Sequence, residues 1–247
     1  MTGILLAIGE NARDLTALAG LAAALGIGHT LAGPDHYLPF LALARVGRWS
    51  YGRTLAVAAL CGLGHVFSSI LLGGVGLLIG LAVGGLEWIE GFRGNVAGWL
   101  LLGFGLAYTA WGIRQAIRNR PHTHDHLHPD GTSHSHEHAH QGGHSHVHVD
   151  AQRRRAMTPW VLFVIFVFGP CEPLIPLLMY PAAAHGGWAA LWVALVFGAC
   201  TLSTMLLVVT AGYFGLRMIR LPWLERYAHA LAGLSIVACG LAIRFGL

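Results

Sequence analysis

The sequence contains no lysine and few charged residues. All fifteen basic side chains are arginine, and charged residues make up 11% of the 247 residues, whereas hydrophobic residues make up 55%. Several uncharged apolar stretches exceed the roughly 18 residues that cross a bilayer as a helix. The arginines lie at the ends of these stretches, where topology signals lie, and do not form a nucleic-acid surface. The composition therefore predicts an integral membrane protein in a lipid bilayer, with no nucleic-acid partner.

Cysteine is also scarce. The chain has four cysteines, and all of them fall inside apolar stretches: Cys61, Cys171, Cys200 and Cys239. Disulfide-rich secreted domains use their cysteines as a framework of extracellular bridges. The position of these cysteines argues against such a framework.

Six apolar runs follow one another along the chain. They cover residues 15–44, 54–86, 94–113, 157–184, 188–216 and about 227–243. Glu87, Glu90 and Arg93 are expected to mark an interfacial turn between the second and third runs. We therefore predict an all-α integral membrane protein with six transmembrane helices. Its parts are a first three-helix repeat (1–120), a His-rich loop (121–156) and a second three-helix repeat (157–247).

The arginines are distributed unequally between the two faces that six spans define. Twelve lie on the face with the polar loop: Arg45, Arg48, Arg53, Arg114, Arg118, Arg120, Arg153, Arg154, Arg155, Arg217, Arg220 and Arg226. Three lie on the other: Arg13, Arg93 and Arg244. The positive-inside rule predicts a multi-pass protein of the cell (inner) membrane, with the loop cytoplasmic and both termini outside.

Three titratable side chains interrupt the first apolar run: His29, Asp35 and His36, beside Gly33-Pro34. Proline removes a backbone donor, so the helix should break here, and a broken membrane helix is tolerated only against protein or a water-filled cavity. Titratable groups at this depth are costly unless they are paired or hold a cation. The segment is therefore interpreted as half of an ion site. The alternative is a kinked helix whose polar side chains bond to neighbouring helices.

The break recurs after the polar loop, where Gly169-Pro170 is followed by Cys171-Glu172 at an offset of 136 residues. Other positions match at this offset: Gly62 with Gly198, His65 with Thr201, Ser68 with Thr204, and Gly76 with Gly212. Three spans precede the loop and three follow it, so one repeat must be inverted relative to the other. Secondary transporters use this plan and bind their cargo where the broken helices meet. We predict an inverted 3+3 repeat with broken helices 1 and 4.

Imidazole and carboxylate groups together suit Ni, Co, Zn, Cu or Fe, whereas Mg and Ca prefer oxygen alone. His65 is either a ligand or a packed core histidine. Glu172 is a cation partner, a proton carrier, or a neutral group bonded across helices. The predicted metal site comprises His29, Asp35, His36, His65, Glu172 and Cys171.

Histidine is concentrated in the polar loop. Eleven histidines lie there: His122, His124, His126, His128, His134, His136, His138, His140, His144, His146 and His148. An expression tag would be contiguous and terminal, whereas these residues are interleaved and internal. Alternating histidines in a flexible tract without apolar content bind several transition-metal ions weakly. The loop is predicted to capture, buffer or sense metal.

His29 through Asp35-His36, Gly64-His65 with Ser68-Ser69, and the His-rich loop resemble the nickel/cobalt transporter (NicO) family and its UreH-like relatives. The resemblance implies a permease rather than an enzyme, with Ni²⁺ or Co²⁺ as cargo and no permanently bound cofactor. Uptake-type members have four residues between His and Asp-His, whereas five separate His29 from Asp35. On a continuous helix the extra residue rotates His29 by about 100°.

A second resemblance and a further interpretation give alternative functions. Pro170-Cys171 is similar to a motif of six-span thiol-disulfide membrane transporters, but its repeat partner is Asp35, so the second cysteine is missing. A sulfite or other anion exporter would need arginine or lysine within the membrane. The preferred prediction is a metal permease. Proton coupling is expected because its ligands lose protons on binding metal, and the position of the loop favours export.

Overall fold

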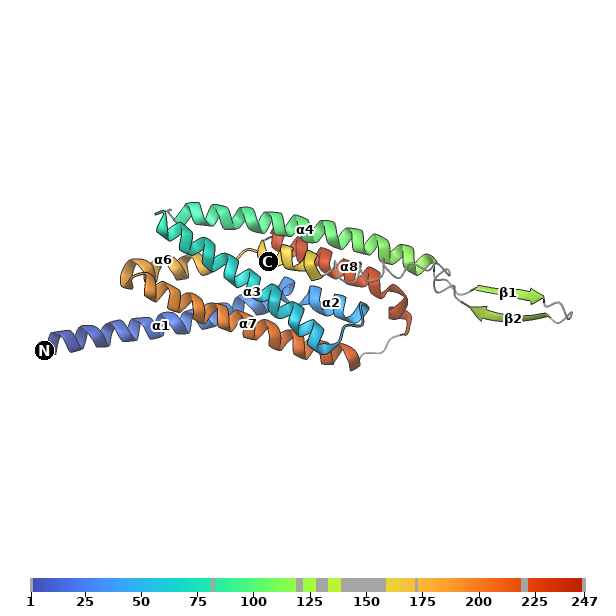
Figure 1. Ribbon diagram of the computed structural model, residues 1–247, viewed down its shortest axis with the longest axis horizontal. Helices are drawn as coiled ribbons and strands as arrows, with labels where there is room; N and C mark the ends of the chain where they lie inside the picture. Colours follow the sequence, from blue (N-terminus) through green and yellow to red (C-terminus); the bar gives the residue numbers. More distant parts are fainter. Residues whose placement is uncertain are drawn as a thin grey trace.

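The computed structural model describes residues 2–80, 83–118, 122–127, 133–138, 159–171, 173–218 and 222–245. Its body is a bundle of long helices (Figure 1). The elements of the first half are α1 (Thr2–Ala32), the 3₁₀ helix η1 (Pro34–His36), α2 (Leu38–Val46), α3 (Tyr51–Leu78) and α4 (Val83–Arg118). The second half contains a helix over residues 159–167, then α6 (Leu174–His185), α7 (Gly187–Met218) and α8 (Pro222–Phe245).

Five of the described helices are long and apolar enough to cross a membrane. These segments are Arg13–Ala32, Tyr51–Leu78, Gly84–Ile117, Gly187–Met218 and Tyr227–Phe245. Large apolar side chains point away from the bundle, for example Phe67, Leu78 and Leu207, which are 67%, 87% and 70% exposed. Such a surface suits hydrocarbon and not water. The chain is a multi-pass membrane protein.

Two of the apolar runs are interrupted at their Gly-Pro pairs. In the run over residues 15–44, α1 ends at Ala32 and the chain passes through η1 before α2 begins at Leu38. In the run over residues 157–184, the helix over residues 159–167 ends before Gly169-Pro170, and α6 starts at Leu174. The predicted breaks are therefore confirmed. The described helical residues of this run, 159–167 and α6, are each fewer than a spanning helix needs.

The turn between the second and third runs lies earlier than predicted. Helix α3 ends at Leu78, Gly80 adopts a positive φ of 69°, and α4 begins at Val83. The predicted interfacial turn at Glu87–Arg93 is wrong, because these residues lie inside α4. Opposite charges three residues apart on a helix pair with each other and need not end it. Arg93 consequently no longer counts as a surface topology signal.

Glycines allow close packing between pairs of helices. Helix α4 packs along α8, and a Cβ atom at Gly105 would lie 2.7 Å from the backbone nitrogen of Val237. The glycines at this contact recur every seven residues on each helix: Gly98, Gly105 and Gly112 on α4, and Gly233 and Gly240 on α8. Small residues at such spacing let membrane helices approach closely.

The polar loop contains a hairpin of two antiparallel strands, β1 (His122–Leu127) and β2 (Ser133–His138) (Figure 1). The backbone register pairs His122 with His138, His124 with His136, and His126 with His134. The hairpin lies outside the helical body, which is all-α as predicted. The other loop histidines lie outside the described residues: His128, His140, His144, His146 and His148.

Candidate metal centre

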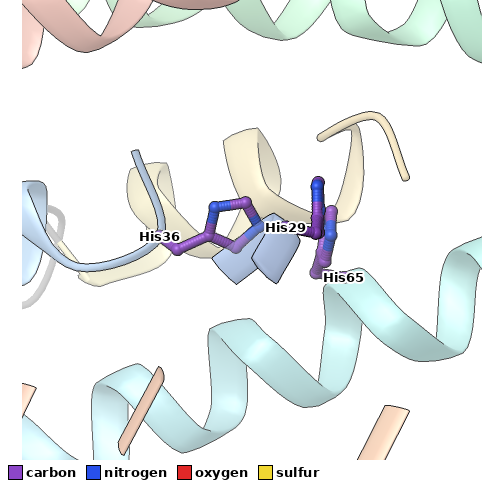
Figure 2. A group of neighbouring side chains, drawn as sticks. All are labelled: His29, His36 and His65. Atoms are coloured by element: carbon purple, nitrogen blue, oxygen red, sulfur yellow. The ribbon is translucent and has the colours of Figure 1, made fainter. Parts of the chain in front are cut away.

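Three histidines from three elements meet inside the bundle. His29 lies in the last turn of α1, His36 ends η1, and His65 lies in the middle of α3. One ligand nitrogen of each ring lies within 4.8 Å of those of the other two. The ring centroids of His29 and His36 are 4.7 Å apart, and those of His36 and His65 are 5.4 Å apart. Figure 2 shows the rings gathered around a common point. We call these three residues the histidine cluster.

The rotation expected for His29 does not occur. The rotation of about 100° applies to a continuous helix. Here α1 ends at Ala32, and the backbone leaves the helical conformation at Gly33. Gly33 has an extended backbone, with φ −89° and ψ 96°. The break therefore brings His36 back to His29 although five residues separate His29 from Asp35.

The Nε2 atoms of all three rings are buried and have no hydrogen-bond partner in the described part of the chain. The other nitrogens of two rings face carbonyl oxygens: His36 Nδ1 lies 3.1 Å from Gly33 O, and His65 Nδ1 lies 3.3 Å from Phe166 O. A ring that donates through Nδ1–H keeps a lone pair on Nε2, and this is how metal-binding histidines are usually oriented. Because buried polar atoms are rarely left unpaired, the cluster has the chemistry of a cation site.

Both Gly-Pro breaks border the cluster. A Cβ atom on Gly33 would lie 2.5 Å from His36 Nδ1, and one on Gly169 would lie 2.9 Å from His65 Nδ1. A side chain at either position would force the neighbouring imidazole to shift. Glycine at both positions therefore allows the close approach of the ring.

Asp35 lies beside the histidine cluster and contacts His36. Its Oδ1 atom lies 3.4 Å from His36 Nδ1, and its side chain is 18% exposed. The carboxylate is not among the groups whose ligand atoms lie mutually within 4.8 Å. In this position Asp35 can orient the His36 ring and does not share the point at which the three rings meet.

Two predicted ligands are not brought to the cluster. Cys171 is fully buried in a separate apolar group with Leu174 and Phe197, and its backbone N–H donates to Glu90 Oε2 at 3.1 Å. Its thiol is not part of the group of ligand atoms found among the described residues. Glu172 lies outside the described residues.

An ion pair on α4 that is not among the predicted site residues lies inside the bundle. Arg93 Nη1 binds Glu90 Oε1, and these side chains are only 11% and 3% exposed. Arg93 Nη2 also donates to Val167 O and to Ser68 Oγ, both at 2.7 Å. The pair thus ties α4 to the second break and to α3, one turn from His65. The Glu-x-x-Arg spacing within an apolar segment was the available signal, because it places the two charges on one helix face.

Three neutral imidazoles suit divalent transition metals and leave further coordination positions for other ligands. Two nitrogens bound to one ion at about 2.1 Å lie at most about 4.2 Å apart, so a small inward rotation of the rings would complete the site.

Comparisons with known proteins do not identify the chain: no family model, curated protein or solved structure matches it.

Proposed function

We propose that the chain is a transmembrane permease for a divalent transition-metal cation, with nickel or cobalt as the cargo. The observation that carries the proposal is the convergence of three imidazoles at the break of an apolar helix, each with a buried Nε2 atom that has no hydrogen-bond partner among the described residues. Polar groups at this depth are costly and are typical of ion pathways. The resemblance of His29 through Asp35-His36 to the nickel/cobalt transporter family supports the choice of cargo. His29, His36 and His65 act as the ligands, and Asp35 acts through His36.

The inverted 3+3 arrangement is part of this proposal, and matching positions of the two repeats support it. A Cβ atom on Gly62 of α3 would lie 2.8 Å from Leu202 of α7, and one on Gly198 of α7 would lie 2.5 Å from Val66 of α3. The matched glycines thus lie on opposite sides of the contact between α3 and α7 and allow these helices to pack closely. His65 and its match Thr201 are both buried, and each has a polar atom without a hydrogen-bond partner among the described residues. With each broken run counted as one span, the described part of the chain contains six.

The hairpin acts as a metal reservoir on the cytoplasmic face. Directly opposed residues of an antiparallel pair have Cα atoms about 4.5–5.5 Å apart, and three such pairs are His–His. The arginine excess around the loop places it in the cytoplasm by the positive-inside rule. A metal-collecting segment on that side favours export. Histidines must release protons to bind metal, so an opposing proton gradient can drive release.

The proposal is tested with the full chain in proteoliposomes, by measuring uptake of Ni²⁺, Co²⁺, Zn²⁺ and Mn²⁺ with and without a pH gradient. We expect saturable Ni²⁺ or Co²⁺ flux that the gradient accelerates. His36→Ala should abolish this flux. Replacing the eleven loop histidines by glutamine should weaken it without abolishing it, because the loop supplies metal but does not form the pathway.

His229→Gln is the matched control. His229 is also a histidine of a spanning helix, but its Nδ1 pairs with the Tyr108 hydroxyl at 3.1 Å, away from the cluster. Its replacement should leave metal flux unchanged. Absence of flux for every metal, together with reversible oxidation of Cys171 by a thioredoxin-like partner, would replace the permease with the thiol-disulfide alternative.

A further inference from the structure

Thr201 of α7 carries a buried hydroxyl that makes no hydrogen bond within the described part of the chain. The residue is 1% exposed, and its Oγ1 atom has no partner there. Among the described residues, the remaining buried side-chain atoms without such a partner are the Nε2 atoms of the histidine cluster. A buried hydroxyl without a partner is destabilising relative to an apolar group of the same shape. Packing alone therefore does not account for threonine at this position.

Other threonines of the described helices show how such a hydroxyl is usually satisfied. Four of them donate to the carbonyl four residues earlier, at 2.7–3.0 Å: Thr30, Thr54, Thr109 and Thr210. This bond within one helix is a common arrangement for threonine. Thr201 does not make it to the carbonyl of Phe197. Its hydroxyl lies toward α1 instead, where a Cβ atom on Gly26 would be 3.1 Å from Oγ1.

The contact with α1 places Thr201 within about one helical turn of His29. Gly26, which faces the hydroxyl, precedes His29 by three residues on α1. On α7, Phe197 precedes Thr201 by four residues, and its ring centroid lies 6.3 Å from that of His29. Residues three or four apart on a helix lie on the same face. The hydroxyl and the His29 ring therefore belong to the same side of this helix pair.

The crossing of α3 and α7 brings Thr201 to a second member of the cluster. The glycine contacts described above place residues 198–202 of α7 against residues 62–66 of α3. Thr201 lies in the first stretch and His65 in the second. The histidine cluster thus has a buried hydroxyl beside it on α7, at the position that the repeat matches to His65.

We propose that the Thr201 hydroxyl binds a water molecule that is itself a ligand of the cargo ion. This inference rests on the proposed function. Three imidazoles leave positions open on Ni²⁺ or Co²⁺, and water can fill them. The bound water donates the hydrogen bond, because its lone pair lies on the ion, and the hydroxyl oxygen accepts it.

The dimensions favour a bridging water over direct coordination. A metal–oxygen bond of about 2.1 Å followed by an O–H···O bond of about 2.8 Å spans about 4.9 Å. One turn of helix rises about 5.4 Å. A water-mediated contact therefore suits a residue that lies about one turn from the cluster.

The test is calorimetric titration of the full chain in detergent with Ni²⁺ or Co²⁺, in protein whose loop histidines are glutamine. Thr201→Val removes the hydroxyl and nearly keeps the shape of the side chain. Metal affinity should fall about tenfold, at the lower end of the effect of losing an outer partner. The melting temperature without metal should be unchanged or higher, because a buried group without a partner is removed. Thr201→Ser keeps the hydroxyl and should retain the affinity.

Thr109→Val is the matched control. Thr109 is also a buried threonine of a spanning helix, but its hydroxyl donates to Gly105 O at 2.7 Å and the residue packs against Gly233 of α8. Its replacement should leave metal affinity unchanged.

Thr201→Cys tests the bridging water. A thiolate that binds Co²⁺ directly adds a sulfur-to-metal charge-transfer absorption to the spectrum of the parent protein. We expect no such absorption, because a water molecule separates position 201 from the ion.

Four outcomes overturn the proposal. Unchanged affinity in Thr201→Val assigns the hydroxyl to the contact between α1 and α7. An equal loss in Thr201→Val and Thr201→Ser reduces the effect to packing. A new sulfur absorption in Thr201→Cys excludes the bridging water. These three results leave the metal site in place, whereas absence of Ni²⁺ and Co²⁺ binding by the parent protein overturns the proposed function as well.

Discussion

The two breaks share a Gly-Pro pair and have different surroundings. At the first, the chain satisfies its own backbone: Gly33 N–H donates to His29 O at 3.0 Å, and His36 N–H donates to Gly33 O at 3.1 Å. At the second, Val167 O accepts from side chains of other helices, Arg93 and Ser68. The first break also carries a histidine of the cluster, whereas the second contributes a glycine and a carbonyl that touch His65. The Gly-Pro pair therefore positions a histidine of the cluster directly at the first break and supports another histidine of the cluster at the second.

The difference follows from how each helix end is completed. A helix that stops leaves carbonyl groups without intrahelical partners, and in a bilayer these groups must be satisfied within the protein. The 3₁₀ turn at Pro34–His36 does this locally. The second break has a local bond from Gly169 N–H to Phe166 O, and it also bonds to the buried pair Glu90–Arg93 of α4 through Val167 O and Cys171 N–H.

The largest effect is expected when the second break loses this support. Arg93→Leu leaves the buried Glu90 carboxylate without its cation, which typically costs about 3–5 kcal/mol. The melting temperature in detergent should fall strongly, whereas Arg114→Leu, at an exposed position, should leave it unchanged. Glu90→Leu with Arg93→Leu should recover part of the loss because no lone charge remains. An unchanged melting temperature in Arg93→Leu would mean that the second break supports itself as the first does.

The next largest effect is expected when the first break loses its ligand. In protein whose loop histidines are glutamine, His36→Ala should lower Ni²⁺ or Co²⁺ affinity by more than about 100-fold, because even outer partners of metal ligands contribute 10–100-fold. Calorimetric titration measures this, with His229→Gln as the control. An unaltered affinity would place the metal site away from the first break.

The glycines test whether both breaks serve one site. Gly33→Ala and Gly169→Ala introduce a Cβ atom against His36 and His65, respectively. Each should lower metal affinity about tenfold, at the lower end of the effects of disturbing a ligand's surroundings. Gly28→Ala, beside His29 and with no atom within 4 Å of the added Cβ, is the control. If only Gly33→Ala weakens binding, the second break does not belong to the site.

The smallest effect is expected at Asp35. Asp35→Asn removes the carboxylate beside His36 Nδ1, but Gly33 O still faces that nitrogen at 3.1 Å. Metal affinity should fall about fivefold, less than the 10–100-fold loss of a sole outer partner. The same calorimetric titration measures it. A loss as large as that of His36→Ala would make Asp35 a direct ligand, as the sequence pattern first suggested.

Part of the candidate site could be predicted from the sequence. His29, His36 and His65 stand out because titratable groups are rare within apolar runs, and all three meet in the structure. Cys171 stands out equally and lies elsewhere. Glu90 and Arg93 resembled the polar end of a span, but they neutralise each other and are buried. Composition shows that a polar residue is unusual but does not show its partner.

The sequence by itself determined the membrane-spanning character of the chain and the positions of its two breaks. Both depend on local properties, namely the length of apolar runs and the backbone donor that proline lacks. Only the tertiary structure decided which polar groups meet. Their partners lie far apart in the chain, as Arg93 and Val167 do, and helix packing through glycine sets the distances between them. The two breaks therefore differ in their contacts although both contain a Gly-Pro pair.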